Sequence, residues 1–592
     1  MRKIVVAVAL LVTTGCSHKP AAEFSKLAGE ATYKILSFSP VNASAQGLHK
    51  FENVDLDSQL DDLRYNNSIR KQRDYLVELH KRMLDFDRAT LSPEDRADYD
   101  VIESQIGLAL FETDIAETWS RSPQMYVELI GSALFNPLVL EYAPKEQRFR
   151  HIISRLEKVS GYLEVARRQL FDSPQIWIDV AKEENEGNIA LVDKTLREAV
   201  PANLKTQYDT AAAGALDALR TFNRFLETEL PAKRRGRSRE WQLGPEKYAT
   251  KFKLALATDR THDQVLADAE SRLKAVRMNM LELSKPLHTK WFAAHGEHGD
   301  LKAEALENKL IREVLDHIAQ DHSTPESYFQ DADKYLAEAR SFAQSKNLLT
   351  LPAGSNLQVI PTPEFFRGAF GVGGFNPAPV LEPNLGAFFW ITPIPSNWPK
   401  ERVESKLREY NAYNLRLLAV HEAMPGHYVQ GEFANAVEPK QRRVLRSLFS
   451  NGPYVEGWAQ YITQVMLDEG YLDNSPEIRL TLLKQELRVD ANAILDIRLQ
   501  TNRMTDDEAM TLMESLTFQE HEEAVAKLQR AKLSSTQLPT YFIGWRDWLR
   551  VRQHVKATGK NFNLRDFHDR ALKEGAVPLP VLAQLLTGKP LN

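Results

Sequence analysis

The segment between His421 and His427 constrains this chain most, because it places a Pro-Gly pair inside an otherwise apolar, helix-like stretch. With about 3.6 residues per turn, a straight helix would point these two histidines in directions about 120° apart. Pro425 cannot donate its backbone hydrogen bond, and Gly426 can adopt positive φ. We therefore expect a bulge of two residues here that turns both imidazoles to one side.

Glu422 directly follows His421, and two histidines that flank a glutamate are typical of zinc hydrolases. In such sites the histidines bind the metal and the glutamate acts as general base. The approach over residues 415–420 is largely apolar, so a charge buried here needs a partner. The alternative is a helix that ends at Met424, before the proline, with two unrelated histidines around a turn.

A catalytic zinc ion needs three protein ligands and one open position, so the two histidines need a third partner. Glu456 is the candidate, because Asn451 can cap a helix there and Pro453 suits its first turn. Gly457 would permit another backbone to approach closely. The alternative is a glutamate that is favoured near a helix N-terminus by the helix dipole. We predict one Zn²⁺ bound by both histidines and Glu456.

The N-terminus is typical of a bacterial lipoprotein signal peptide. Two basic residues precede an apolar run over residues 4–12, which is too short to span a membrane. Residues 13–16 resemble a lipobox, in which Cys16 would be acylated and would hold the protein at a membrane surface. Ser17 resembles outer-membrane sorting, so we expect the outer membrane, facing the periplasm. Thr13 replaces the usual Leu or Val, and a plain signal peptide cut nearby is the alternative.

Composition narrows the chemistry further. Cys16 is the only cysteine among 592 residues, so a disulfide within the chain is impossible and a metal must take nitrogen and oxygen ligands. This favours zinc over a thiolate cluster. A net charge of -5 with 26% charged residues offers no field for nucleic acid, which we exclude as a partner.

Apolar residues recur at three- and four-residue spacing through most of the chain, which predicts a mostly α-helical fold. Five basic residues interrupt this pattern between residues 231 and 239, as is typical of a solvated linker, with a phosphate or lipid-headgroup contact as the alternative. We predict a signal peptide over residues 1–16, an N-terminal helical lobe with its linker over 17–240, and a catalytic lobe over 241–592.

The one convincing sheet signal lies between residues 349 and 395. Residues 357–360 and 386–392 are short apolar or aromatic runs bounded by prolines and glycines. We expect a small β-sheet next to the metal-binding helix, whose edge strand could pair with an extended peptide. A structural hairpin that supports the helix is the alternative. The glycines of residues 368–374 favour a mobile cleft loop over a dinucleotide site, because prolines follow where a helix would begin.

Several motifs resemble those of one bacterial family, the domain-of-unknown-function 885 proteins. The likeness covers residues 241–544 and rests on His421–His427 (HExxPGH), Glu456–Tyr461 (EGWAxY), Trp241–Tyr248 (LGPExY), and Gln537, Tyr541 and Gly544 (QxxxYxxG). Ser535 and Thr536 replace the usual Pro-Gly, and Thr463 stands where a second glutamate is typical. The resemblance implies a two-lobed, zincin-like metallopeptidase, many members being candidate lipoproteins.

In the mechanism that this implies, zinc polarises the scissile carbonyl while Glu422 takes a proton from water and delivers it to the leaving amine. Tyr541 is expected, by its place in the family-like late motif, to donate to the oxyanion. Arg498 is the second choice for the oxyanion or for a substrate carboxylate, although a structural ion pair is the more common role. Asp490 or Asp496 could orient a ligand histidine, and nothing in the sequence selects between them.

Other histidines are expected to be structural. His521 and Glu522 lack a second histidine at metal-binding spacing, which is typical of an exposed helix face. Residues 295–298 combine two histidines with a glycine and a glutamate in a turn, which favours a surface loop over a metal site.

The sequence therefore favours zinc-dependent hydrolysis of peptide bonds in the bacterial cell envelope. One alternative is a non-catalytic lipoprotein that binds a metal or peptides without cutting them. Another is a zinc hydrolase of a non-peptide amide. The cleft shape that sets the substrate is not encoded in any motif.

Overall fold

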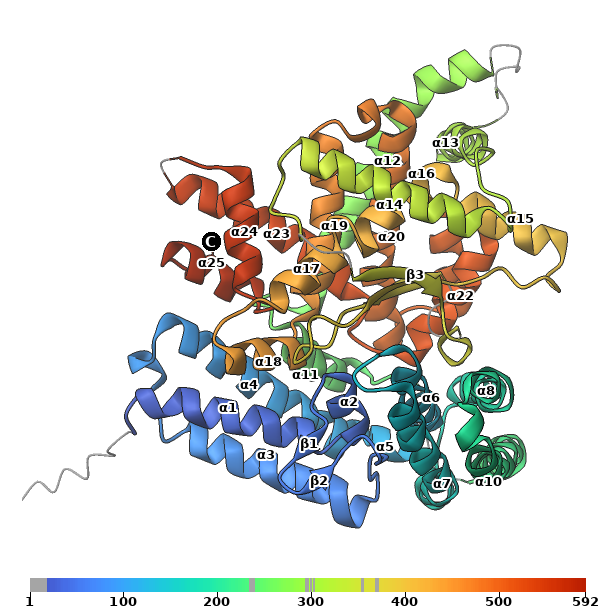
Figure 1. Cartoon of the computed structure of the whole chain (residues 1–592). Helices are drawn as coiled ribbons and strands as arrows, with labels where there is room; N and C mark the ends of the chain where they lie inside the picture. The colour runs from blue at the N-terminus through green and yellow to red at the C-terminus, as the bar shows by residue number, and fades with distance from the viewer. Residues whose placement is uncertain are drawn as a thin grey trace, which may run out of the picture.

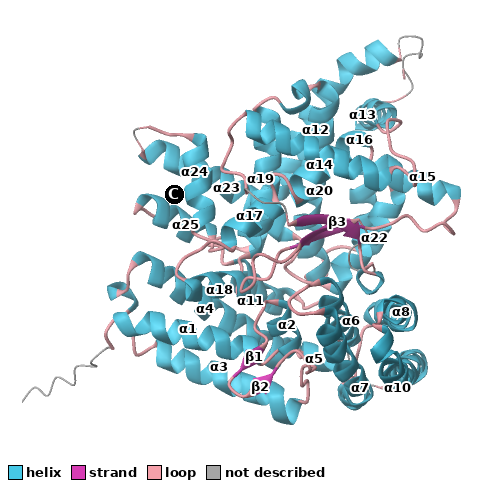
Figure 2. Ribbon diagram, in the orientation of Figure 1, coloured by secondary structure: helices cyan, strands magenta, loops and turns pink. Residues whose placement is uncertain are grey.

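The computed structural model describes residues 19–233, 240–292, 298, 301, 304–352, 356–367, 372–559 and 561–591. Within these residues the chain is mostly helical with a small sheet near its middle, as the sequence predicted (Figures 1 and 2). Cys16 and most of the basic linker lie outside the described residues, so the lipid anchor stays a prediction. None of the helices described is long and apolar enough to cross a membrane.

The N-terminal helices form a layer against the C-terminal half of the chain (Figure 1). In it, Arg446 donates to Asp98 at 2.8 Å, and the neighbouring Arg442 donates to the same carboxylate at 2.7 Å. These two arginines belong to α18 and the aspartate to α4. The elements of this layer are α1 (Ala22–Ser37), α2 (Pro40–Ala45), β1 (Lys50–Phe51), β2 (Val54–Asp55), α3 (Arg70–Met83) and α4 (Pro93–Phe111).

A second group of helices has its own hydrophobic core (Figure 1, teal and green). Its elements are α5 (Thr118–Arg121), α6 (Pro123–Val139), α7 (Lys145–Gln169), α8 (Gln175–Ala190), α9 (Arg197–Ala199) and α10 (Lys205–Arg224). Phe365, from the short 3-10 helix Glu364–Phe366 that follows strand β3, inserts into this core and is 1% exposed. The segment next to the sheet thus packs against the second group of helices.

The remaining helices build the larger core together with the N-terminal layer. They are α11 (Pro245–Leu256), α12 (His262–Trp291), α13 (Glu304–Ile318), α14 (Tyr328–Ser345), α15 (Lys400–Glu409), α16 (Ala412–Glu422), α17 (His427–Ala434), α18 (Lys440–Leu448), α19 (Gly452–Asp468), α20 (Pro476–Gln500), α21 (Asp506–Thr511), α22 (His521–Leu533), α23 (Pro539–Thr558), α24 (Leu564–Lys573) and α25 (Leu579–Thr587). The larger core contains residues from both sides of residue 240, and the lobe boundary there stays a prediction.

The sheet has three strands in the order β3 (Leu357–Pro361), β5 (Ala387–Ile391) and β4 (Gly373–Asn376). β3 runs parallel to the central strand β5, and β4 runs antiparallel to it. β5 is buried along its whole length, which explains its continuous apolar sequence. The expectation of a mobile loop over residues 368–374 is wrong for Gly373 and Gly374, because both belong to β4; residues 368–371 lie outside the described residues.

Candidate metal centre

The two histidines lie on separate helices rather than on one bulged helix. α16 ends at Glu422, and α17 begins at His427. Between them the N–H of Gly426 donates to the carbonyl of Val420 at 3.0 Å, which folds the connection back on the helix end. The indole N–H of Trp458 lies 3.1 and 3.2 Å from the carbonyl oxygens of Pro425 and Gly426. The helix therefore ends before the proline, two residues earlier than the Met424 of the alternative interpretation, and the expected two-residue bulge is wrong; the histidines nevertheless come together.

Gly426 is needed for a different reason from the one the sequence suggested. Its φ is −75°, so the expected positive φ is wrong. A Cβ at this position would instead lie 1.9 Å from the carbonyl oxygen of His421 and 2.4 Å from that of Val420. Only a residue without a side chain lets the connection pass this close to the end of α16.

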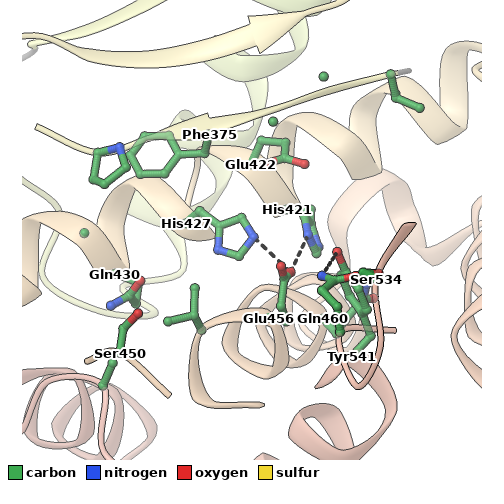
Figure 3. Close-up of a pocket in the computed structure, with 18 of the residues that line it drawn as sticks. Phe375, His421, Glu422, His427, Gln430, Ser450, Glu456, Gln460, Ser534 and Tyr541 are labelled. Atoms are coloured by element: carbon green, nitrogen blue, oxygen red, sulfur yellow. Dashed lines mark hydrogen bonds and ion pairs between the residues drawn. The ribbon is translucent and has the colours of Figure 1, made fainter. Parts of the chain in front are cut away.

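The imidazoles of His421 and His427 face one carboxylate (Figure 3). Their ring centroids are 4.7 Å apart and the rings are nearly perpendicular, at 84°. The Nε2 atoms of His421 and His427 lie 3.7 and 3.4 Å from Oε2 of Glu456. The structure thus brings together the three predicted ligands, although they come from three helices.

The two distances between Oε2 of Glu456 and the imidazole nitrogens are close to the spacing of two ligands on one metal ion. Ligand atoms of a tetrahedral zinc site with bonds of about 2.0–2.1 Å are about 3.3 Å apart. Oε2 of Glu456 is buried and has no hydrogen-bond partner among the described residues. A buried carboxylate oxygen without a hydrogen bond is costly, and a shared cation would satisfy it. One Zn²⁺ fits this donor set.

The electrostatics of the site follow from this arrangement. Burial would raise the pKa of Glu456, but the two imidazoles beside it hold the pKa well below its usual value. Burial would also lower the pKa of His427, but Glu456 outweighs this and raises the pKa. The carboxylate is therefore ionised at neutral pH, as a metal ligand must be.

Glu422 lies beside the histidines and lines the same cavity (Figure 3). One of its carboxylate oxygens is within 4.8 Å of a ring nitrogen of each of the two histidines. The side chain is 9% exposed, so it faces the cavity rather than bulk solvent. This is the position that a general base needs next to a metal.

Glu456 is placed by the start of α19. Asn451 caps this helix by accepting from the backbone N–H of Tyr454 at 3.0 Å, as predicted. A Cβ on Gly457 would lie 2.3 Å from the backbone carbon of Gly544, so α19 and α23 cross at two glycines. The predicted close approach at Gly457 is confirmed. It brings α23, which contains Tyr541 and Gly544 of the late motif, next to the helix that contains Glu456.

Tyr541 belongs to α23 and lines the cavity next to His421 and Glu456 (Figure 3). Its hydroxyl oxygen accepts from Arg530 at 3.0 Å and from Gln537 at 3.3 Å. Because both neighbours donate to the oxygen, the hydroxyl hydrogen is left for another acceptor. Burial raises the pKa of Tyr541, so the phenol keeps this proton at neutral pH.

Arg498 is not brought to the site. It pairs with Glu270 of α12 and does not line the cavity. Asp496 accepts from the hydroxyl of Tyr248 at 2.7 Å and from the backbone of Thr536 at 3.0 Å, so it links two motifs instead of orienting a histidine. Asp490 is buried, and it shares no described hydrogen bond with His421 or His427.

The cavity has a volume of about 800 Å³ and is bounded by several parts of the fold. The metal centre, the edge strand β4 with Phe375, and the start of α6 all contribute to its wall. It is also lined by four basic residues that the sequence did not single out, namely Arg446, Arg488, Lys527 and Arg530. The sequence indicates only that Lys527 and Arg530 are three residues apart on one helix, which places them on the same face.

Two of the other histidines that the sequence singled out, His521 and His298, belong to the described residues, and their structural role stays a prediction. His521 is exposed, as expected of a helix face, and its Nδ1 lies 2.6 Å from Oε1 of Glu514. His298 contacts Glu313 at 3.1 Å, and the same carboxylate oxygen is 2.7 Å from His288. Residues 295–297 lie outside the described residues.

Together the fold and the site define a mostly helical protein with a candidate metal centre in the wall of a large cavity. The chain belongs to the family described as bacterial protein of unknown function, DUF885, which it matches over residues 40–586. The resemblance seen in the motifs is thereby confirmed. The match extends well into the N-terminal helices, where no motif was visible. No curated protein matches the chain.

Two solved structures are similar to this chain over almost its whole length. A candidate lipoprotein of unknown function from Shewanella oneidensis is 25% identical, with a TM-score of 0.75, and the match covers 96% of this chain and 100% of that chain. A candidate lipoprotein from Colwellia psychrerythraea is 17% identical, with a TM-score of 0.74, and the match covers 96% and 98%. The second comparison establishes a shared fold.

Proposed function

We propose that this protein is a zinc metallopeptidase of the bacterial cell envelope, built as a two-lobed, zincin-like hydrolase. One observation carries the proposal: His421, His427 and Glu456 converge on one point at the wall of an 800 Å³ cavity, with Glu422 beside them. A structural zinc site would be closed by four protein ligands, whereas this set leaves a position open toward the cavity.

Zinc bound there would supply Lewis-acid polarisation of the scissile carbonyl and a lowered pKa for water. A carboxylate oxygen of Glu422 accepts a proton from the attacking water and passes it to the nitrogen of the leaving amine. The hydroxyl of Tyr541 donates its free hydrogen to the oxyanion that forms at the carbonyl. The peptide bond breaks as the amine leaves with the transferred proton.

The edge strand β4 supplies a place for an extended peptide. β4 is paired on one side with β5, and its Gly373, Gly374 and Phe375 line the cavity. A peptide added to this edge would use backbone hydrogen bonds and would lie beside His427, whose ring stacks near Phe375 at 6.4 Å. Peptides are therefore a better substrate than small amides without a main chain.

An envelope location is supported by the lipobox-like segment that ends at Cys16 and by the description of both solved relatives as candidate lipoproteins. A lipid anchor would place the cavity at a membrane surface, within reach of peptides in the periplasm. Outer-membrane sorting follows from Ser17 and is part of the same proposal.

A peptide-library digest with the zinc-loaded protein tests the proposal. We expect wild-type protein to cleave peptides, a chelator to stop cleavage, and Glu422→Gln to keep its zinc while cleavage falls by about 10²–10⁴-fold. Equal activity of Glu422→Gln would contradict the general base. Zinc binding without any cleavage would favour a non-catalytic binding lipoprotein. Cleavage confined to non-peptide amides would favour a zinc hydrolase of such amides.

A further inference from the structure

One wall of the cavity is cationic. Arg488 of α20 and Lys527 and Arg530 of α22 line it, and we call these three residues the cationic wall. Glu523, one turn before Lys527, is the carboxylate that contacts Arg488 and Lys527. It pairs with Arg488, whose guanidinium also donates to Tyr410 at 3.0 Å. Two of the three basic residues thus share one carboxylate, and Arg530 forms no ion pair with a described residue.

Lys527 is the least satisfied of the three. Its side chain is 4% exposed, and its ammonium makes no hydrogen bond within the described parts of the chain. The nearest carboxylate oxygen, on Glu523, is 4.0 Å from Nζ. Burial, reinforced by Arg488, holds the pKa of Lys527 well below its usual value. An anion that enters the cavity would stabilise the charged form of this amine.

Arg530 connects the cationic wall to the metal centre. Its guanidinium donates to the neutral oxygens of Gln537 at 2.9 Å and Tyr541 at 3.0 Å, and it forms no ion pair with a described residue. Tyr541 in turn lies beside Glu456 (Figure 3). An anion bound by this wall would therefore lie near the scissile bond, not at a remote part of the surface.

We propose that the cationic wall binds the free C-terminal carboxylate of a peptide, so that the protein cleaves near the C-terminal end. This inference rests on the proposed peptidase function and names its substrate class. Arginine and lysine donate to carboxylates, and a row of cations repels the N-terminal ammonium of a peptide. A cavity of about 800 Å³ holds a short segment, which suits the end of a chain better than its middle.

The test compares two peptides of one sequence that lacks Asp and Glu, one with a free C-terminal carboxylate and one with a C-terminal amide. With zinc-loaded wild-type protein we expect kcat/KM for the amide to be about 100-fold lower, because a buried charge loses its partner. Acetylating the N-terminus should change kcat/KM little. Equal cleavage of acid and amide would overturn the inference while leaving the peptidase function intact.

A third peptide separates the two sources of a carboxylate. It ends in an amide and carries one glutamate at the penultimate position. Rapid cleavage of this peptide, with poor cleavage of the amide that lacks glutamate, would assign the wall to an acidic side chain and would overturn the C-terminal assignment. We expect slow cleavage of both amides.

Two variants locate the recognition. Lys527→Met removes the ammonium from the cavity and is expected to raise KM for the acid about tenfold, with little change for the amide. Lys406→Met is the matched control, because Lys406 is also buried near Glu523 but does not line the cavity. It should keep the preference for the acid. Loss of preference in Lys406→Met but not in Lys527→Met would contradict the assignment.

A binding measurement keeps the inference independent of catalysis. Calorimetry with zinc-loaded Glu422→Gln protein compares the acid peptide with the amide. Tighter binding of the acid supports the cationic wall even if wild-type protein cleaves nothing, in which case the peptidase proposal fails alone. Equal binding of the two peptides by a folded protein overturns the inference.

Discussion

Two clusters among the described residues combine two histidines with one glutamate, and they differ in what else they contact. At the metal centre, the Nε2 atoms of His421 and His427 stay 3.4–3.7 Å from Glu456, and no ammonium group pairs with this carboxylate in the described structure. On α12 and α13, His288 and His298 approach Glu313 to 2.7 and 3.1 Å, and Lys309 holds its other oxygen at 3.1 Å.

In our proposal, this difference distinguishes the candidate metal centre from an ion-pair cluster. In the second cluster the carboxylate already has hydrogen bonds and a lysine, so a cation would have to displace them. That cluster also lines neither of the cavities described, whereas the first opens into about 800 Å³. Residue types alone do not define a metal site, and the spacing between donor atoms and the competing charges decide.

The largest expected effect is the loss of metal from one cluster but not from the other. His427→Ala should lose the bound zinc, because two remaining ligands hold the ion weakly. His288→Ala should keep one zinc per chain. Elemental analysis of the two variants and wild type measures this directly. A zinc content that falls in His288→Ala and not in His427→Ala would reverse the assignment of the two clusters.

The next effect concerns the cavity side of the metal centre. Tyr541→Phe removes one hydroxyl and should lower kcat by about 10²–10³-fold with the zinc content unchanged, as for other oxyanion donors. Arg498→Ala is the control, because Arg498 pairs with Glu270 away from the cavity. Kinetics with a peptide that wild-type protein cleaves measure kcat for both variants. A large loss in Arg498→Ala with none in Tyr541→Phe would exchange the two roles.

Local signals predicted the parts of the site that depend on helix geometry. The cap at Asn451 and the small residue at Gly457 are short-range features, so the sequence located Glu456 correctly on its helix. Gly426 was recognised as special for the wrong reason, because the close approach of the His421 carbonyl depends on how the connection folds back. Periodicity likewise predicted the helical fold.

Features that depend on distant residues were missed. The partner of Arg498, Glu270, is 228 positions away, and nothing near Arg498 in the sequence indicates it. Lys527 lies on a helix with many charges, a pattern that usually marks a solvated face, yet packing buries it at 4% exposure. Strand β4 was hidden by its glycines, which are rare in strands but here let it approach the backbone of Trp390.

The smallest expected effect concerns the stability that Glu313 contributes in the ion-pair cluster. Burial raises the pKa of Glu313, but hydrogen bonds from His288, Lys309 and His298 outweigh it and lower the pKa to about 2. A carboxyl whose pKa is lowered on folding stabilises the protein above its unfolded pKa of about 4.5, and this stability is lost as pH falls toward 2. Glu313→Gln should therefore cost about 1 kcal/mol at most near pH 5.5.

Urea unfolding of wild type and Glu313→Gln between pH 5.5 and 3 measures the gap in unfolding free energy, which should narrow as pH falls. Glu157→Gln removes the same charge from an exposed position on α7 and should show no such narrowing. A gap that stays constant over this range would mean that the cluster does not hold its carboxylate ionised. In that case Lys309 would not explain why the cluster around Glu313 binds no metal. Only the measured zinc content would then distinguish this cluster from the one around Glu456.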